Sequence, residues 1–526
     1  MDDLASGTPP APPAPASRRR VVVTGVGAVT ALGADLAATV RALSRGETAG
    51  GAALPPTVPG AAGDPGELGA ERAGVNALVA TVPGLDVRRH FRTPKALKVC
   101  DRRTRLAVAA AAMALADAGL ADGAEQADWG VVLGTSGSDP GAEDLADALA
   151  GDAGERSASD IPFFAERILS RLHPLWLVVQ LPNMTSAHVA IQFGLQGPNS
   201  TVMTDWVAGT QAIGEAFLWV QQGEADVVLA GGADVGTTLL SQVSYRQCGL
   251  FAGPAGSAPP LAEGAAVLVL EERERARRRG AAILGEILGY ASAAELAASP
   301  DEASRVAGEA RDTAAVTAAE ETAGAAEAAE AAEDIAAASQ AAAGSALARA
   351  ASQALAAAGW DSGAVSWLIS GGAASAARWR LEESALASIG CALGGWFDPA
   401  ARLGHALAAQ GPIALALALF RGEGAALPGD SGAAEGPGAR LLCSGRGLLG
   451  QAAVLAIAVC GGGAPPWWGG GRSSWLGGGG TPPWCGSGGT PPWCGSGGTP
   501  PWCGSVGTPP SRSVGAASPA VEGTSA

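Results

Sequence analysis

The chain has 526 residues, and its 34 Lys and Arg against 50 Asp and Glu give a formal net charge of -16. This length can bury a sizeable core and is enough for roughly two to four domains. The acidic balance, together with the lack of a basic stripe along any segment, disfavours direct nucleic-acid binding.

Residues 1–17 are rich in Pro and Ala, and we interpret them as a disordered leader. They lack the basic start and apolar centre of a secretory signal, and no window holds about 18 uninterrupted apolar residues. The sequence therefore predicts a cytoplasmic protein without a membrane span. The cysteines that precede the C-terminal tail are scattered, so neither a metal site nor a disulfide framework is predicted.

Residues 18–33 form a β-branched run that ends in glycines, the pattern of a buried strand that leads into a turn. From Asp101 to Gly119 an Ala- and Leu-rich run predicts a helix, which Asp101 caps and Gly119 ends. Strands alternating with helices indicate an α/β architecture with largely buried sheets. Further strands are predicted within residues 129–138, 223–234 and 264–271.

Two segments differ in composition from the α/β part. Residues 297–344 are Ala- and Glu-rich with almost no large apolar residue, which predicts a solvated insertion that is partly helical or disordered. Residues 461–526 contain nine-residue repeats of the type TPPWCGSGG. Metal or carbohydrate contact is one reading of their Trp-Cys pairs, but we favour a flexible Pro/Gly tail that arose from a duplicated coding repeat.

The segment TVMTDWVAGTQAIGEAF, residues 201–217, predicts a strand that turns sharply into a helix, with Trp206 at the corner. An enzyme would usually carry a nucleophile at such a corner. The longer segment 183–234 around it resembles the β-ketoacyl-acyl-carrier-protein synthases, the condensing enzymes of fatty-acid and polyketide synthesis. The likeness extends to VVVTGVGAVTALG, to the helix after Asp101, to AEGAAVLVLE and RLGHALAAQGPIALALALF, and more loosely to SGRGLLGQAA.

The resemblance implies a thiolase-like α/β fold, in which two related halves form a layered αβαβα arrangement. Residues 18–278 would be the N-terminal half, and residues 279–460 the C-terminal half with the insertion 297–344. Members of the family usually pair as dimers through the region around the nucleophile strand. Acyl carrier protein is the partner that the family's reaction requires.

The family transfers an acyl chain to a cysteine, decarboxylates malonyl-carrier protein and joins the two units. A helix N-terminus favours the thiolate, and backbone N–H groups stabilise the charge that develops on the thioester oxygen. Two histidines stabilise the enolate, and a lysine lies nearby. The resemblance thus implies phosphopantetheine thioesters as substrates or ligands, with no metal and no other cofactor.

The family's Thr-Ala-Cys-x-x-Gly context matches residues 204–209, which puts Trp206 at the nucleophile position. An indole offers no nucleophile that could carry a thioester. The family's first histidine aligns with Gly372, or with Gly371 if the turn slips by one residue. Its downstream aspartate and glutamate then fall on Arg380 and Glu383.

The second histidine is retained as His405, while the lysine expected five residues earlier is Ala400. We interpret His405 as a remnant, because a lone buried histidine is usually structural. The turn SGRGLLGQAA places Leu448 at a family phenylalanine position. The backbone N–H groups of Trp206 and Leu448 are therefore the candidate oxyanion hole, a role that needs no particular side chain.

The other histidines, His90, His173 and His188, are expected to be structural, since no paired base or ligand spacing accompanies them. Cys248 is interpreted as a small hydrophobe rather than a substitute nucleophile.

The first hypothesis for function is a non-condensing homologue, comparable to a chain-length factor, that pairs with a cysteine-containing ketosynthase. Such factors typically carry glutamine where this chain has Trp206. One alternative is a malonyl-carrier-protein decarboxylase, as in members where glutamine replaces cysteine and both histidines act. The other alternative is a degenerate, inactive homologue.

Overall fold

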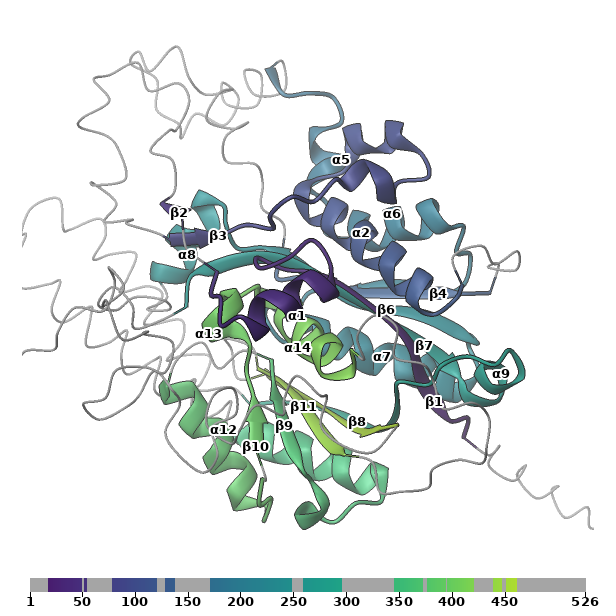
Figure 1. Cartoon of the computed structure of the whole chain (residues 1–526), viewed down its shortest axis with the longest axis vertical. Coiled ribbons are helices and arrows are strands. Elements are labelled where there is room, and N and C mark those ends of the chain that lie inside the picture. The colour runs from purple at the N-terminus through teal and green to yellow at the C-terminus, as the bar shows by residue number, and fades with distance from the viewer. Residues whose placement is uncertain are drawn as a thin grey trace, which may run out of the picture.

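The structure is a computed structural model that describes residues 18–49, 52–53, 78–120, 128–137, 171–247, 259–295, 345–371, 376–393, 395–420, 439–446 and 451–460 (Figure 1). The leader 1–17, the insertion 297–344 and the tail 461–526 lie outside these residues, so what the sequence predicts for them stays a prediction.

The strands form one sheet whose main path runs in the order β10-β9-β11-β12-β8-β1-β7-β6-β4-β5. A short strand pair, β2 (Ala52–Ala53) with β3 (Leu78–Ala80), joins this path at β7. The strands of the first half are β1 (Val21–Val29), β4 (Gly130–Gly134), β5 (Asn199–Val202), β6 (Val227–Val235) and β7 (Leu261–Glu272), and those of the second half are β8 (Gly285–Ala294), β9 (Trp367–Ser370), β10 (Gly395–Phe397), β11 (Arg440–Arg446) and β12 (Gln451–Val459).

The two halves have the same topology. When the five strands of each half are numbered along the chain, both halves show the spatial order 3-2-4-5-1. In both, strand 2 is parallel to strands 3 and 4, and strand 5 is antiparallel to strands 4 and 1. The halves meet where β1 pairs with β8, with Val21 opposite Ile287. This repetition confirms the fold of two related α/β halves.

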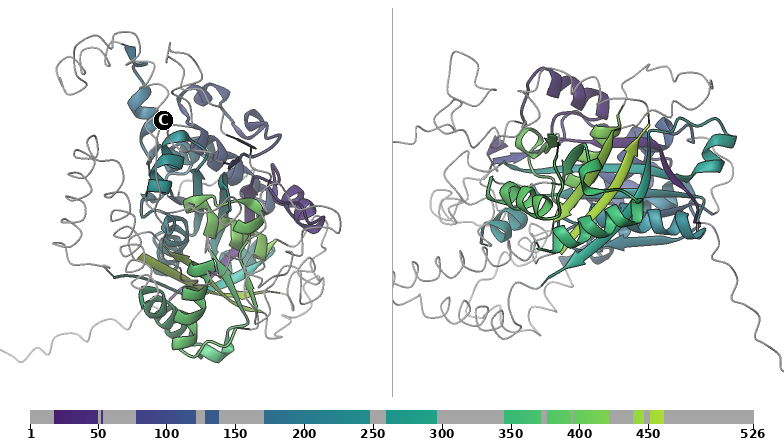
Figure 2. Two further views of the ribbon diagram at one scale, coloured as in Figure 1. Left: turned by 90° about the vertical axis from the view of Figure 1, so that its left-hand side faces the viewer. Right: turned by 90° about the horizontal axis from the view of Figure 1, so that it is seen from below.

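Helices lie outside both halves and between them (Figures 1 and 2). The central helices are α7 (Ala208–Gln222) and α14 (Gln410–Leu419), which contact each other and strands of both halves. On the outer face of the first half lie α2 (Arg102–Asp117) and α6 (Met184–Phe193), and on that of the second half lie a helix at 345–358 and α12 (Ala376–Ser388). The remaining helices are α1 (Leu36–Ser44), α5 (Trp176–Gln180), α8 (Leu239–Gln247), α9 (Arg273–Arg278), α13 (Ala400–Leu403) and the 3₁₀ turns η1 (Val87–His90), η2 (Pro94–Val99), η3 (Ser362–Ala364) and η4 (Leu407–Ala409).

Hydrophobic burial follows these layers. Helix α14 has the sequence QGPIALALAL, and every one of its residues is buried, as expected of a helix that is apolar all round. Helix α2 starts as the sequence predicts, because the Asp101 carboxylate accepts a hydrogen bond of 2.7 Å from Thr104 N. It stops just before Gly119, whose φ is +66°. Among the described residues, no helix is long and apolar enough to cross a membrane.

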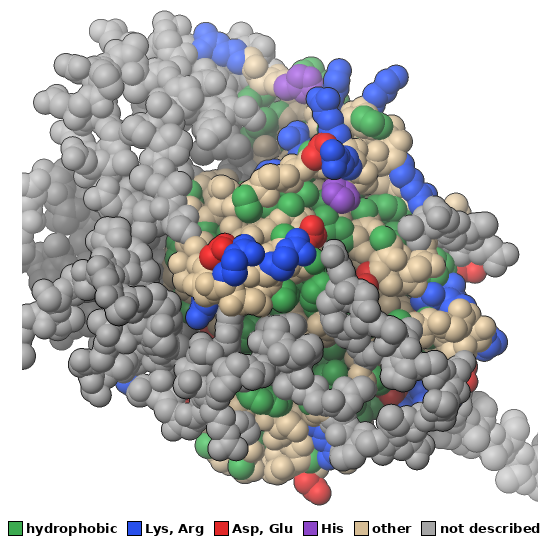
Figure 3. All heavy atoms as spheres, viewed as in Figure 1, with side chains coloured by type: hydrophobic (Ala, Val, Ile, Leu, Met, Phe, Trp, Pro, Cys, Tyr) green, Lys and Arg blue, Asp and Glu red, His purple; other side chains and the backbone are tan. Residues whose placement is uncertain are grey.

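The surface near α2 carries a basic segment that the sequence prediction missed. Residues 87–98 form η1 and η2, and Arg88, Arg89, Arg92, Lys95 and Lys98 are all exposed. Figure 3 shows Lys and Arg side chains gathered at the upper right of the molecule, near α5 and α2. The prediction that no segment carries a basic stripe is therefore wrong here. The net charge of the whole chain concealed this local cluster.

Candidate functional site

The corner at Trp206 joins β5 to α7, as the sequence predicts. The strand ends at Val202, and α7 begins at Ala208, two residues after Trp206. Asp205 has a φ of +58°, a left-handed conformation that Asp tolerates better than most residues. Ala208 N donates to Asp205 O at 3.1 Å and closes the turn. The chain thus reverses sharply and brings Trp206 to the start of a central helix.

The Trp206 side chain is buried and has aromatic neighbours on two sides. It is 1% exposed and clusters with Leu261, Leu407 and Tyr245. The Trp206 and His405 ring centroids are 4.6 Å apart, and those of Trp206 and Tyr245 are 5.7 Å apart. Both pairs are tilted, within the range of favourable aromatic contacts. The indole therefore fills the space at the corner instead of facing an open cleft.

Tyr245, on α8, holds the corner from the other side. Its hydroxyl donates to Asp205 Oδ1 at 3.2 Å. Burial, with the negative charges of Asp205 and Asp234, raises the pKa of Tyr245 far enough to keep the phenol protonated. Tyr245 thus serves as a hydrogen-bond donor, and no general base is available at this position at neutral pH.

His405 is fully buried and held mainly by its backbone. His405 N donates to Pro260 O at 2.8 Å, and Ala262 N donates to His405 O at 2.9 Å, so the residue bridges to the start of β7. In its ring, Nδ1 accepts from Leu407 N at 3.2 Å. An Nδ1 that accepts a hydrogen bond carries no proton, so the neutral ring has its proton on Nε2.

Two glycines let the His405 loop approach the corner closely. A Cβ atom on Gly209, in the first turn of α7, would lie 2.1 Å from Ala408 O. A Cβ atom on Gly232, in β6, would lie 2.6 Å from the same oxygen. Backbone therefore packs on backbone where the C-terminal half meets the corner, and side chains larger than hydrogen do not fit there.

The position of the family's first histidine is refined by the structure. Gly371 directly follows β9, whereas Gly372 lies outside the described residues. A Cβ atom on Gly371 would lie 2.4 Å from Ser444 O, so only glycine fits there. The spacing that joins Gly372 to Glu383 also joins Gly371 to Glu382.

Burial distinguishes the two glutamates. Glu383 and Arg380 are exposed, while Glu382 is 1% exposed and forms a buried ion pair with Arg446 at 2.9 Å. Glu382 is thus the one of the two acids that the fold holds inside, while the alignment of Glu383 with the family's glutamate stays a prediction.

Of three further predicted positions, the structure describes Ala400 but not Leu448 or Cys248. Ala400, at the lysine position, is buried at the start of α13, and its N–H donates to Asp398 Oδ1 at 2.9 Å. Leu448 lies outside the described residues, so the oxyanion hole of Trp206 and Leu448 stays a prediction. Cys248 lies outside them as well.

The remaining histidines lie apart from the corner. His188, on α6, is buried, and burial lowers its pKa, as burial also does for His90 in η1. His173 is exposed. The described residues hold no group of three or more His, Cys, Asp or Glu arranged for a metal.

Of the four described thiols, Cys391 is buried with a raised pKa and Cys460 is half-buried. Cys100 and Cys443 are buried, and burial raises the pKa of each to about 12. Neither belongs to the cluster around Trp206.

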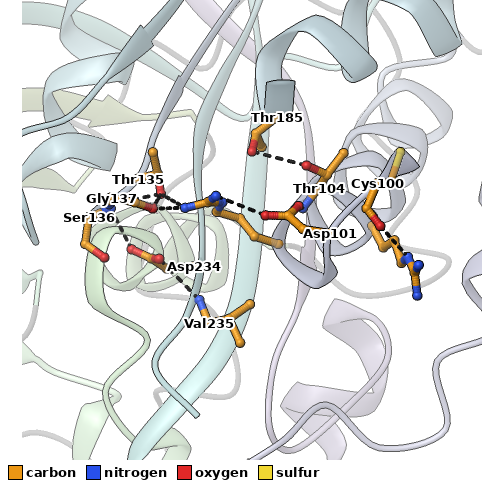
Figure 4. A network of polar contacts seen from close by, with 11 residues as sticks. Cys100, Asp101, Thr104, Thr135, Ser136, Gly137, Thr185, Asp234 and Val235 are labelled. Atoms are coloured by element: carbon orange, nitrogen blue, oxygen red, sulfur yellow. Dashed lines mark hydrogen bonds and ion pairs between the residues drawn. The ribbon is translucent and has the colours of Figure 1, made fainter. Parts of the chain in front are cut away.

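Sequence reasoning missed Asp234, at the end of β6. Its carboxylate is buried, and Oδ2 accepts from Ser136 N at 2.8 Å (Figure 4). Oδ2 also accepts from Ala408 N at 3.2 Å. Burial raises the pKa of Asp234, although the positive charge of Arg103 and the hydrogen bonds oppose this. The only signal in the sequence was an acid at the end of an apolar strand, in VVLAGGAD.

The fold is that of the thiolase-like ketosynthases. One solved structure, described as the ishigamide ketosynthase/chain length factor, matches with a TM-score of 0.60 and 21% identity over 84% of this chain and 100% of its own. Another, a type II polyketide acyl-carrier protein in complex with its ketosynthase bound to the hexaketide, matches with a TM-score of 0.58 and 22% identity over 84% and 100%. At these identities the likeness establishes the fold.

The sequence comparisons name the family. Residues 18–276 match the model of the beta-ketoacyl synthase, N-terminal domain. A 3-oxoacyl-[acyl-carrier-protein] synthase 2 of Synechocystis is 32% identical over 289 residues, which are 52% of this chain and 62% of that protein. These matches support a member of the β-ketoacyl synthase family, with the family model covering residues 18–276. The chain spans less than two thirds of the curated relatives that it matches first.

Proposed function

We propose that this chain is a non-condensing member of the β-ketoacyl synthase family that acts beside a cysteine-containing ketosynthase, in the manner of a chain-length factor. The observation that carries the proposal is the packing of Trp206. Its buried indole occupies the nucleophile position and lies 4.6 Å from His405, centroid to centroid. A side chain that fills the site and cannot form a thioester leaves the fold without the acyl-transfer step.

Losses around the corner support the same conclusion. Glycine is the only residue that fits at position 371, where the shifted alignment puts the first histidine. Ala400 supplies no ammonium group. The retained His405 uses Nδ1 to accept a backbone hydrogen bond, which fits a structural role. Decarboxylation of malonyl-carrier protein, which in the family relies on both histidines, is therefore the weaker candidate.

The basic segment supports an acyl carrier protein as partner. Five exposed cationic residues gather in residues 88–98 of a chain whose formal net charge is -16. A local positive surface on an acidic protein attracts acidic partners and raises their rate of association. Lys95 and Lys98 are the only lysines of the whole chain. We propose this segment as the docking surface for the carrier protein.

The edge strand β5 supports pairing with a second ketosynthase-fold subunit. Among the described residues, β5 forms ladder hydrogen bonds with β4 alone, so its other edge is available. Met203 directly follows β5 and is 52% exposed, and Ile191, on the α6 helix that contacts β5, is 66% exposed. Leu177, 63% exposed, lies on α5, which contacts α6. Exposed apolar side chains beside an open strand edge are typical of a protein interface.

The first experiment measures the intact mass of the protein after incubation with acyl-carrier-protein thioesters. We expect no covalent acyl adduct on residues 201–217, because the indole at the corner cannot accept the chain, and peptide mapping distinguishes this from acylation of the cysteines elsewhere in the chain. A cysteine-containing ketosynthase serves as the positive control. An adduct on residues 201–217 would overturn the proposal, and release of carbon dioxide from malonyl-carrier protein would favour the decarboxylase instead.

The second experiment mixes the chain with a cysteine-containing ketosynthase and measures mass by sedimentation. We expect a heterodimer, and we expect Met203→Arg to weaken it because a charge would be buried at the interface. Arg278→Glu, at the exposed end of α9, is the control variant. No association and no change in the ketosynthase's activity would contradict the partner role.

A further inference from the structure

We propose that Asp234 is the positioning residue of this site: its carboxylate anchors the loop that carries His405 and thereby keeps His405 packed on Trp206. Three segments that are distant in sequence act on this side chain at the end of β6. The turn after β4 and the loop of η4 each donate a backbone N–H to it, and Arg103 on α2 acts on it by its positive charge.

The carboxylate oxygen Oδ2 is the centre of the arrangement. It accepts from Ser136 N at 2.8 Å and from Ala408 N at 3.2 Å, while Oδ1 accepts from Val235 N at 3.2 Å. Asp234 is 4% exposed, so these bonds are not exchanged with bulk water. A buried carboxylate that loses such donors is destabilised, and so is a buried N–H that loses its acceptor.

Arg103 supplies the opposing charge from α2. Its Nη1 donates to Thr135 Oγ1 at 2.9 Å and also to Gly137 O, so it grips the turn that contains Ser136 on both sides. Its Nη2 donates to Asp101 Oδ2 at 2.9 Å. Figure 4 shows these groups in one continuous polar chain from the start of α2 to Asp234. Arg103 therefore holds the turn after β4 in the conformation in which Ser136 N donates to Asp234.

The loop from His405 to Ala408 is short and has an unusual backbone conformation, so its end points determine where His405 lies. Ala408 is three residues from His405, and Leu407 between them has a φ of +50° and donates its N–H to the His405 ring. A loop with this conformation needs fixed points at both ends to persist. One end is the backbone bridge of His405 to Pro260 and Ala262, and the other is the bond from Ala408 to Asp234.

The test compares Asp234→Ala with Asp234→Asn, which keeps one acceptor oxygen. Hydrogen exchange is measured on peptides that cover residues 405–409. The signal of Trp206 is isolated by subtracting the fluorescence of the matching Trp206→Phe protein, and its quenching by acrylamide is recorded. For Asp234→Ala we expect loop exchange at least ~10-fold faster and a quenchable Trp206, while Asp234→Asn stays close to the parent protein.

The matched control is Glu271→Ala. Glu271 is a fully buried carboxylate on β7 that pairs with Arg275 and Arg279, and it lies toward the end of the β6–β7 ladder remote from Asp234. We expect this variant to lower the melting temperature without changing loop exchange or the quenching of Trp206. Equal changes in the control would overturn the proposal, as would an unchanged loop in Asp234→Ala or a loop equally loosened in Asp234→Asn.

If Asp234→Ala does not fold, Asp234→Ser replaces it, because a hydroxyl on one carbon is too short to reach both amides. The same loosening of the loop is expected. This inference shares one element with the proposed function, namely that the Trp206 side chain is packed at the corner. Its readouts need no carrier protein or partner, so a negative result here leaves the acyl-adduct experiment untouched.

Discussion

The two halves of the molecule share one topology but use the end of their third strand differently. In the N-terminal half β5 leads through a tight turn into α7, and an aromatic side chain, Trp206, fills the space at the turn. In the C-terminal half β10 leads through α13 and a longer loop into α14, and that loop is held by backbone hydrogen bonds and by Asp234. The two halves thus share one framework, and in the described residues they differ in what fills and holds the end of the third strand.

The largest effect is expected from removing the aromatic filling. Trp206→Ala should lower the free energy of unfolding by about 3–5 kcal/mol, because a buried indole leaves a cavity that its neighbours fill only in part. Denaturant unfolding at equilibrium measures the change. Trp219→Ala, on the less buried face of α7, provides the comparison and should cost clearly less. Equal losses in the two variants would show that the corner contributes no special stability.

The second prediction tests the close contact between the halves. Gly209→Ala puts a Cβ atom 2.1 Å from Ala408 O, so the loop must move, and we expect a loss of roughly 1–3 kcal/mol in the free energy of unfolding. Gly363→Ala is the control, since a Cβ there meets no atom within 4 Å. A Gly209→Ala protein as stable as the control would mean that the two halves are not packed as tightly as the geometry indicates.

The third prediction concerns the charge that joins the halves. Because the pKa of Asp234 is raised in the folded state, the folded protein binds more protons than the unfolded chain between the ordinary value of 3.8 and the raised value. The stability that Asp234 contributes is therefore full below pH 3.8 and is lost as the pH rises through the folded pKa. The charged group that acts on it is Arg103, and the buried phenol of Tyr245 is the titratable group that feels its charge.

Relative to Asp234→Asn, the parent protein should gain stability as the pH falls through the raised folded pKa toward 3.8, with a slope of at most about 1.4 kcal/mol per pH unit, the limit for one proton. Chemical unfolding of both proteins at several pH values from about 4 to 8 gives the difference. A difference that stays constant, or that falls at lower pH, would contradict the raised pKa.

The local elements of this arrangement could be predicted from the sequence, whereas contacts between distant segments could not, for physical reasons. The strand and helix around Trp206 have strong local patterns, and so does the helix capped by Asp101. The burial of Glu382 and its ion pair with Arg446, 64 residues away, could not be predicted from the local sequence.

Interactions between distant segments escaped for a related reason. Asp234 meets Ser136 and Ala408 across 98 and 174 residues, and no local pattern records such contacts. The basic segment escaped because the formal net charge of -16 averages over the chain. Gly372, Leu448 and Cys248 stay predictions of the sequence alone.

The smallest effect is expected at the basic segment, which belongs to the N-terminal half. Lys95→Glu with Lys98→Glu should weaken binding of an acidic carrier protein by about 0.5–1 kcal/mol per charge, since both side chains are exposed and screened by salt. Titration calorimetry at low and at physiological salt measures the loss, which should shrink at higher salt. Arg277→Glu with Arg278→Glu on α9 changes the net charge equally and is the control. A uniform effect of net charge would weaken both double variants alike. A loss confined to the lysine pair would therefore locate the docking surface at the basic segment and not elsewhere on the N-terminal half.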